Sequence, residues 1–300
     1  MSVRRNCPVG DTPHVSEDVL SLQQQAPGLK DYRELHQCEE IQDIRHRWPL
    51  LDREPVHSAG FIPDIQSGVH HSHVVLVTGA VGGAGATTVV ASLTAAMRHL
   101  GRRVAVVDLA PGQDMHLHLG TVDAEGGSRA APVLIQRAER LADHPLPARW
   151  LADRLSSLPR DALDCVLIDC PWHLKPAFQQ ASALAGRMLV VGTTEPGAVH
   201  QMGRVLEGLL SADAGVDIHL LLNRFNPAIS LQRDLHMLLH HNPPARLAPV
   251  DIPYDSRVSD SLAKLGNIRD CYPDCEAARG FQVLADWLTD SIVKRLEAAS

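Results

Sequence analysis

The chain has 300 residues, of which 45% are hydrophobic and 21% are charged, and its formal net charge is −7. This composition excludes a wholly disordered chain, predicts one or two domains and leaves enough apolar material for a large core. The acidic balance, without any run of Lys and Arg, argues against nucleic acid as the expected partner.

Three further features concern location and metal content. No stretch of about 18 apolar residues is present, and the N-terminus lacks the apolar segment of a secretory signal. We therefore expect a cytoplasmic protein, in which the six cysteines, none in a Cys-x-x-Cys pair, stay reduced. The 17 histidines include neighbours at 70–73 and 116–118, but no cysteine or carboxylate set completes a metal-ligand count with them.

The N-terminal part predicts a disordered tail over residues 1–15, a helical segment over 16–52 and a linker over 53–73. In the helical segment, Asp31-x-x-Glu34 is a capping-box pattern, and apolar residues follow at helical spacing until Pro49. Two short helices cannot bury an apolar face by themselves, so we expect this segment to dock on another surface. The linker carries Pro, Gly, Ser and His without a period.

From residue 74 the pattern alternates between short apolar runs and helical stretches. The runs predict strands over 74–78, 104–108, 165–169, 188–191 and 218–223. The helical stretches lie at 87–100, 133–143, 147–158, 176–185, 198–212, 230–241, 256–265 and 276–297. Strands that are apolar throughout are typical of parallel sheets buried on both faces, so residues 74–298 predict a doubly wound, mostly parallel α/β fold. Ligands of such folds bind at the carboxyl ends of the strands.

A glycine-rich loop follows the first expected strand. Glycines 82, 83 and 85 allow successive backbone N–H groups to form an anion nest, and the positive end of the next helix points at the same place. Thr87 stands where a hydroxyl could bind Mg²⁺. The residues alone leave open that this loop only packs a strand against a helix.

This loop resembles the deviant Walker A loop of the MinD/ParA ATPase family, which reads Lys-Gly-Gly-x-Gly-Lys-Thr-Thr. Here the same register reads Val81-Gly82-Gly83-Ala84-Gly85-Ala86-Thr87-Thr88. The resemblance implies a P-loop NTPase fold, ATP as the ligand of these loop residues, and Mg²⁺ bound at Thr87. Val81 and Ala86 replace the two lysines of the family, which puts hydrolysis in doubt more than binding.

Other landmarks of the family follow in the expected order. Asp108 corresponds to the first switch aspartate, a possible switch residue, whereas the second switch position holds Ala110. Asp169 corresponds to the Walker B aspartate, a magnesium ligand. The resemblance assigns the base of the nucleotide to Asn223, Arg224 and Pro253. From the residues alone, Asp108 and Asn223 could simply end strands, and Asp169 could cap a helix.

Within the family, the chain resembles the cellulose-biosynthesis branch BcsQ, whose loop also lacks the Walker lysine and keeps the two threonines. Residues 20–32 and the sequence Arg45-His-Arg-Trp-Pro-Leu-Leu51 resemble the small partner protein BcsR of the same secretion system. The chain thus looks like a fusion of the two. We expect residues 16–52 to dock onto the ATPase part, in cis or across a dimer.

The resemblance implies an ATP- and Mg²⁺-binding regulatory or assembly component of bacterial cellulose biosynthesis, a nucleotide-stabilised homodimer with weak or absent hydrolysis. Its expected partners are the cytosolic cellulose-secretion proteins and, through them, the membrane cellulose synthase. Recruitment to the inner membrane would then be indirect, because Asp286, Asp290 and Glu297 on the last helix offset Lys294 and Arg295 and argue against direct insertion.

Three other functions remain as alternatives. One is an active positioning ATPase for another polar or membrane cargo, in which Arg224 would supply the missing charge. A second is a DNA-binding partitioning ATPase, which the lack of a basic stripe disfavours. A third is an iron–sulfur reductase of the same fold, which would need paired cysteines at a dimer seam.

Overall fold

The computed structural model describes residues 40–48, 71–112, 114–119, 133–135, 147, 149–158, 163–211 and 215–299, and in 295–299 only the backbone. The chain divides into two compact units, Met1–Arg53 and Glu54–Ser300. In the first unit residues 40–47 are helical, and the Trp48 N–H donates to Ile44 O at 2.9 Å. The expected tail 1–15 and nearly all of the linker 53–73 lie outside the described residues, as does most of the helical segment 16–52.

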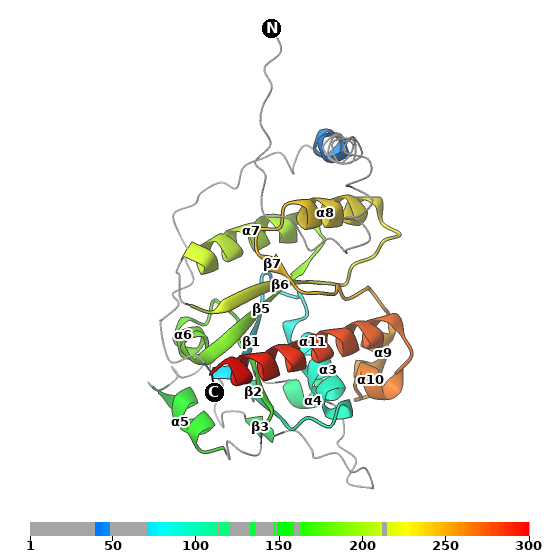
Figure 1. Ribbon diagram of the computed structural model, residues 1–300. Helices are drawn as coiled ribbons and strands as arrows, with labels where there is room; N and C mark the ends of the chain where they lie inside the picture. The colour runs from blue at the N-terminus through cyan, green and yellow to red at the C-terminus, as the bar shows by residue number, and fades with distance from the viewer. Residues whose placement is uncertain are drawn as a thin grey trace, which may run out of the picture. The chain divides into compact units, whose positions relative to one another are not determined.

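In the part of the second unit that the structure describes, a parallel sheet of seven strands runs in the order β3-β2-β4-β1-β5-β6-β7. Every strand pairing in it is parallel. The strands are β1 (His71–Gly79), β2 (Val104–Asp108), β3 (Val133–Ile135), β4 (Cys165–Asp169), β5 (Ala185–Thr193), β6 (Asp217–Asn223) and β7 (Arg246–Leu247). This arrangement confirms the predicted doubly wound fold, and Figure 1 shows β1, the central strand, beside β5.

Helices connect the strands and cover both faces of the sheet. They are α3 (Ala86–His99), α4 (Met115–Leu119), α5 (Trp150–Ser156), α6 (Lys175–Leu184), α7 (Pro196–Ser211), α8 (Ser230–His241), α9 (Arg257–Ala263), α10 (Ile268–Cys271) and α11 (Glu276–Ala299). Among the described residues, none of the helices has the length and apolar run needed to cross a membrane.

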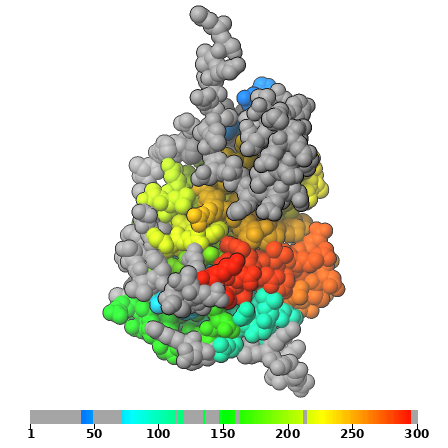
Figure 2. Space-filling view, viewed as in Figure 1, coloured from blue at the N-terminus to red at the C-terminus, as the bar shows by residue number. Residues whose placement is uncertain are grey.

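Alternate side chains of β1 pack into two separate hydrophobic cores, one on each face of the sheet. Val75 and Val77 pack with α3 and α11 on one face, whereas Val74 and Leu76 pack with α5, α6 and α7 on the other. This alternation follows from the period of two in a strand, and the fully apolar run satisfies both faces at once. Figure 1 shows α3 and α11 together on the first face, and Figure 2 shows α11, in red, flanked there by the orange segment that carries α9 and α10.

The prediction over 133–143 was wrong at its start. Val133–Ile135 forms the edge strand β3, paired with β2 from Ala105↔Val133 to Val107↔Ile135, and the remaining residues of that range lie outside the described ones. Three apolar residues after a proline fit either a helix or a strand, and the exposed edge of β2 decides between them. The short elements β7, α4 and α10 had no counterpart in the predictions.

Candidate functional site: the glycine loop at the end of the central strand

The loop between β1 and α3 lies where the carboxyl ends of β1, β4 and β6 meet. Gly83 and Gly85 have φ angles of 76° and 91°, which side chains rarely adopt. At Gly85 a Cβ atom would also lie 2.7 Å from Asn223 Nδ2. The backbone there therefore requires glycine, and the glycine brings the loop against the end of β6.

The amino end of α3 is open to an anion. Gly85 caps the helix without a side-chain hydrogen bond, and the first turn contains no acidic residue. Val89 N–H donates to Gly85 O at 2.9 Å, so the amides that precede Val89 belong to the first turn, whose N–H groups have no helical acceptor. Apart from the adjacent residues of the loop, no atom of the described part of the chain lies within 4 Å of a Cβ built on Gly82 or Gly83. These features match a phosphate-binding nest at a helix amino end.

Thr87 and Asp169 form the polar floor of the loop. The Thr87 hydroxyl donates to Asp169 Oδ2 at 2.6 Å, although the two residues are 82 positions apart. Asp169 ends β4 and is 1% exposed. Burial raises the pKa of Asp169 to about 7, the nearby Asp108 adds to the rise, and the bond from Thr87 opposes it. A cation beside this carboxylate would relieve that cost, and a hydroxyl with a carboxylate is a donor set that suits Mg²⁺.

Asp108 lies beside Asp169 in the sheet, with the two residues in register. Its carboxylate is fully buried and accepts from the Ala110 N–H at 3.0 Å and the Met115 N–H at 3.2 Å. Asp108 therefore holds the turn after β2 and the start of α4. A carboxylate that fixes this turn could pass changes at the loop to α4.

The residues expected at the base lie across from the loop. Asn223 Nδ2 donates to Ala84 O at 2.8 Å, so this side chain ties β6 to the loop. Phe225 and Pro253 form an isolated parallel bridge, and the Tyr254 N–H donates to Phe225 O at 2.8 Å. The structure thus brings Asn223 against the loop and Pro253 beside Phe225, just beyond the end of β6. Thr88, on α3, lines a cavity on the side of α9 and α10, and Arg224 lines the same cavity.

Apolar residues occupy the positions where the family pattern has charges. Val81 and Ala86 pack against the core beneath α3, and Ala110 follows Asp108. A cation nevertheless lies close to the loop: Arg224 Nη2 is 3.5 Å from the position of a Gly85 Cβ. Arg224 has a φ angle of 59°, a left-handed conformation that is rare outside glycine.

Sequence reasoning missed a second polar group, made by His236, His240 and Asp251. The available signal was the spacing of four between the histidines on an expected helix, which places both on one face. Nothing in the sequence indicated which carboxylate would face them.

Comparisons with known proteins agree with this geometry. The profile of the family described as "Cellulose biosynthesis protein BcsQ" matches residues 72–133 and 133–289. The septum site-determining protein MinD of Synechocystis sp. is 30% identical over 177 residues, which are 52% of this chain and 66% of that protein. The chain thus spans slightly less than two thirds of the length of that relative.

Two solved structures share the fold. MinD of Aquifex aeolicus superposes with a TM-score of 0.55 at 20% identity, covering 73% of this chain and 97% of that one. MinD of Pyrococcus horikoshii, solved with Mg-ADP, superposes with a TM-score of 0.54 at 20% identity, covering 72% and 95%.

Proposed function

The chain belongs to the family of the cellulose biosynthesis protein BcsQ, among the MinD- and ParA-type ATPases, and on this basis we propose that it is an ATP-binding component of bacterial cellulose biosynthesis and secretion. In this proposal it is a regulatory or assembly protein that works as a nucleotide-stabilised dimer. Hydrolysis is weak or absent.

The observation that carries the proposal is the Thr87–Asp169 hydrogen bond of 2.6 Å beneath an open glycine loop. In the proposed complex the amides of residues 82–88 bind the phosphates of ATP, and Thr87 and Asp169 hold Mg²⁺. The metal ion would neutralise phosphate charge there. The burial that raises the pKa of Asp169 supports this assignment, because such a buried carboxylate gains most from a bound cation.

The nucleotide base is assigned to Asn223, Arg224 and Pro253. Asn223 already fixes the distance between β6 and the loop through Ala84 O, and Pro253 is held next to Phe225. Contacts within the chain therefore already position this side of the loop. Such positioning favours binding because little conformational freedom remains to be lost.

Three apolar residues support slow chemistry. Val81, Ala86 and Ala110 stand where the resemblance places two lysines and a second aspartate. A lysine on the β- and γ-phosphates and a residue that positions the attacking water are the groups that accelerate phosphoryl transfer. A protein that keeps the nest and the metal ligands without these groups fits a switch that responds to nucleotide binding.

The proposed partners are a second copy of the chain, cytosolic cellulose-secretion proteins and, through them, the cellulose synthase in the inner membrane. Residues 16–52 are proposed to act as a built-in BcsR-like partner segment. The family membership supports the first set of partners. The segment proposal rests on the sequence alone, since most of it lies outside the described residues.

A binding and turnover experiment tests the biochemical part. We expect calorimetry to detect one ATP per chain in the presence of Mg²⁺, with phosphate release close to the background rate. Failure to bind ATP would contradict the proposal. The cellular part is tested by deleting the gene: cellulose output should fall and be restored by the wild-type chain, and an unchanged output would contradict the cellulose role.

A specific observation favours one second candidate, an active positioning ATPase. Arg224 lies beside Gly85 and could supply the charge that Ala86 lacks. The similarity to MinD proteins is compatible with this function. The two candidates differ in the Arg224→Gln variant: a positioning ATPase would show clear turnover in the wild type and lose it in the variant, whereas the switch has little turnover to lose.

A further inference from the structure

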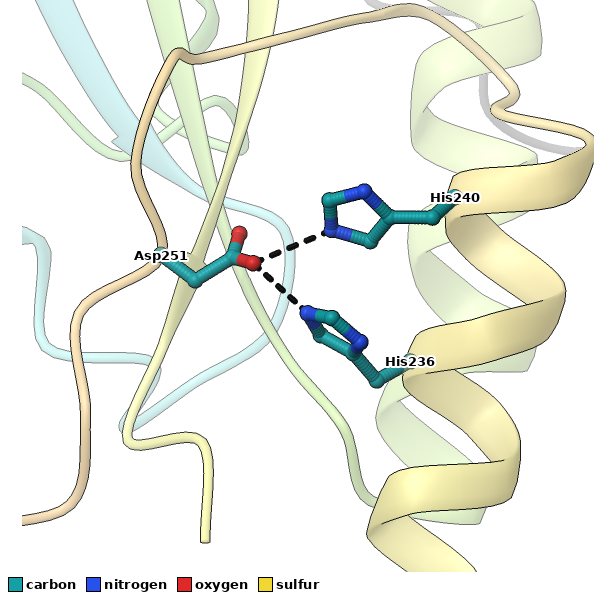
Figure 3. A group of neighbouring side chains, drawn as sticks. All are labelled: His236, His240 and Asp251. Carbon is teal, nitrogen blue, oxygen red and sulfur yellow. Dashed lines mark hydrogen bonds and ion pairs between the residues drawn. The ribbon is translucent and has the colours of Figure 1, made fainter. Parts of the chain in front are cut away.

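Two histidines on α8 face one aspartate from a distant segment. His236 Nε2 lies 2.6 Å from Asp251 Oδ2, and His240 Nε2 lies 3.0 Å from the same oxygen. Figure 3 shows both imidazole rings projecting from α8 toward Asp251, with both contacts ending on one carboxylate oxygen. The two histidines share a helix face because they are four residues apart.

Rigid parts of the second unit hold all three side chains. On α8, Leu235 and Leu239 are buried and fix the helix against the sheet. The Phe225 ring stacks on His236, with centroids 4.2 Å apart and an angle of 13° between the planes. Next to Asp251, the Ile252 N–H donates to Leu222 O at 2.8 Å. The three groups therefore meet without any segment having to reorganise.

One atom from each residue can act as a metal ligand, and these three atoms lie within 4.8 Å of one another. In a tetrahedral zinc site with ligand distances near 2 Å, neighbouring ligand atoms are about 3.3 Å apart. The two contacts to Asp251, 2.6 and 3.0 Å, are slightly shorter than this, and the two histidine nitrogens lie within 4.8 Å of each other, so the three side chains need to adjust their spacing around a metal ion. We propose that His236, His240 and Asp251 form a binding site for a divalent transition-metal ion of the Zn²⁺ type.

The ligand chemistry selects the class of ion. Imidazole nitrogens suit Zn²⁺, Co²⁺ and Ni²⁺, whereas Mg²⁺ and Ca²⁺ prefer oxygen ligands throughout. The side chains of His236, His240 and Asp251 are 25%, 41% and 18% exposed, so water can reach the ion and fill a fourth position. This site is separate from the Thr87–Asp169 pair, and its existence does not depend on nucleotide binding.

A metal ion here would join two segments that are far apart in sequence. It would link α8 to the segment between β7 and α9, which the Phe225–Pro253 bridge also attaches to the end of β6. The expected role is a structural clamp. Zinc should therefore raise the unfolding temperature of the chain, since a ligand that binds only the folded state stabilises it.

The test uses the full chain without a histidine tag, stripped with a chelator and held in excess Mg²⁺. Zinc is titrated in competition with a chromophoric chelator, and Co²⁺ is used separately for its visible absorption bands. His240→Gln is the main variant, because the side chain is 41% exposed and its replacement leaves the core intact. Asp251→Asn is the second variant, and His241→Gln, which alters an exposed histidine of the same helix, is the matched control.

We expect the wild type and His241→Gln to bind one more equivalent of Zn²⁺ than His240→Gln and Asp251→Asn, or to bind it at least tenfold more tightly. The Co²⁺ absorption bands and the zinc-dependent rise in unfolding temperature should appear in the wild type and His241→Gln and be weaker or absent in the other two variants. Comparison among variants removes any contribution from other histidines and cysteines. Identical affinity, stoichiometry and Co²⁺ spectra in all four proteins would overturn the proposal and leave a hydrogen-bonded cluster only.

Discussion

The second unit carries two polar clusters that differ in burial and in ligand chemistry. Thr87 and Asp169 offer oxygen atoms only, and Asp169 is 1% exposed. The cluster of His236, His240 and Asp251 offers two nitrogens and an oxygen, and its side chains are 18–41% exposed.

The difference shows that burial and the type of donor atom determine which metal ion each cluster suits. The buried pair carries a carboxylate whose pKa is raised to about 7, so its ionised form is costly until a cation arrives. Its oxygen donors suit Mg²⁺, a partner of phosphates. The cluster of His236, His240 and Asp251 is partly exposed to solvent, and its imidazoles suit a transition metal with no nucleotide present.

The largest effect is expected from pH acting on the buried pair without metal. The pKa of Asp169 is about 7 in the folded chain, against a reference value of 3.8. Between these values the folded state holds a proton that the unfolded state has released. This contribution to stability is therefore fully present below pH 3.8 and is lost as the pH rises through 7, a change on the order of 4 kcal/mol.

Urea unfolding of the metal-free chain at pH 4.5 and 8.5, an interval that covers most of this range, checks this prediction. The wild type should lose more stability than Asp169→Asn over that interval, since the variant has no ionisable group at this position. Parallel pH dependence in both proteins would mean that Asp169 stays ionised with another compensating partner.

A comparable effect is expected from the same substitution on ligand binding. Asp169→Asn should weaken magnesium-dependent ATP binding by about 100-fold or more, because it removes a charged metal ligand. The matched control is Asp164→Asn. Asp164 immediately precedes the first residue of β4, and its carboxylate forms an ion pair with Arg103 at 3.3 Å. Equal affinity in both variants, measured by calorimetry, would place the metal elsewhere.

A smaller gain is expected when the missing charge is restored. Ala86→Lys should tighten ATP binding by about 10- to 100-fold, the size of a charged hydrogen bond to phosphate. The rate of ATP hydrolysis should rise little, because position 110 still holds alanine in place of the family's second aspartate. Ala86→Gln, a neutral side chain of similar reach, is the control. If the lysine and glutamine variants bind ATP equally, position 86 does not face the phosphates.

The smallest effect is a difference in the free energy of unfolding between alanine substitutions at two glycines of the same loop. Gly85→Ala should lower the free energy of unfolding by roughly 1–2 kcal/mol, because φ is 91° and the new Cβ would meet Asn223 Nδ2. Gly82→Ala should cost less than about 0.5 kcal/mol, since its Cβ would meet nothing within 4 Å. Equal losses on thermal unfolding would show that the Asn223 contact does not hold the loop.

Much of the buried site could be predicted from local sequence. The apolar runs predicted β1, β2 and β4, and parallel strands bring their carboxyl ends together. The proximity of the glycine loop, Asp108 and Asp169 therefore followed from the strand ends. The anchoring bond from Asn223 to Ala84 O did not follow, because a strand end fixes a residue's place but not its hydrogen-bond partner.

The cluster of His236, His240 and Asp251 could not be predicted in the same way. Asp251 lies eleven residues after His240, beyond the two-residue strand β7, and only the folded path of that segment brings it to α8. The strand β3 was also missed, since its three apolar residues become a strand only when they pair with β2. Short elements and contacts across loops depend on tertiary structure more than on sequence pattern.

Sedimentation velocity with Mg·ATP, combined with a phosphate-release assay on the same sample, tests the central proposal most directly. A nucleotide switch predicts that the chain is a monomer without ligand and a dimer with Mg·ATP, with negligible phosphate release and no dimer in Asp169→Asn. A sedimentation coefficient unchanged by Mg·ATP, or rapid release of phosphate, would contradict the proposal.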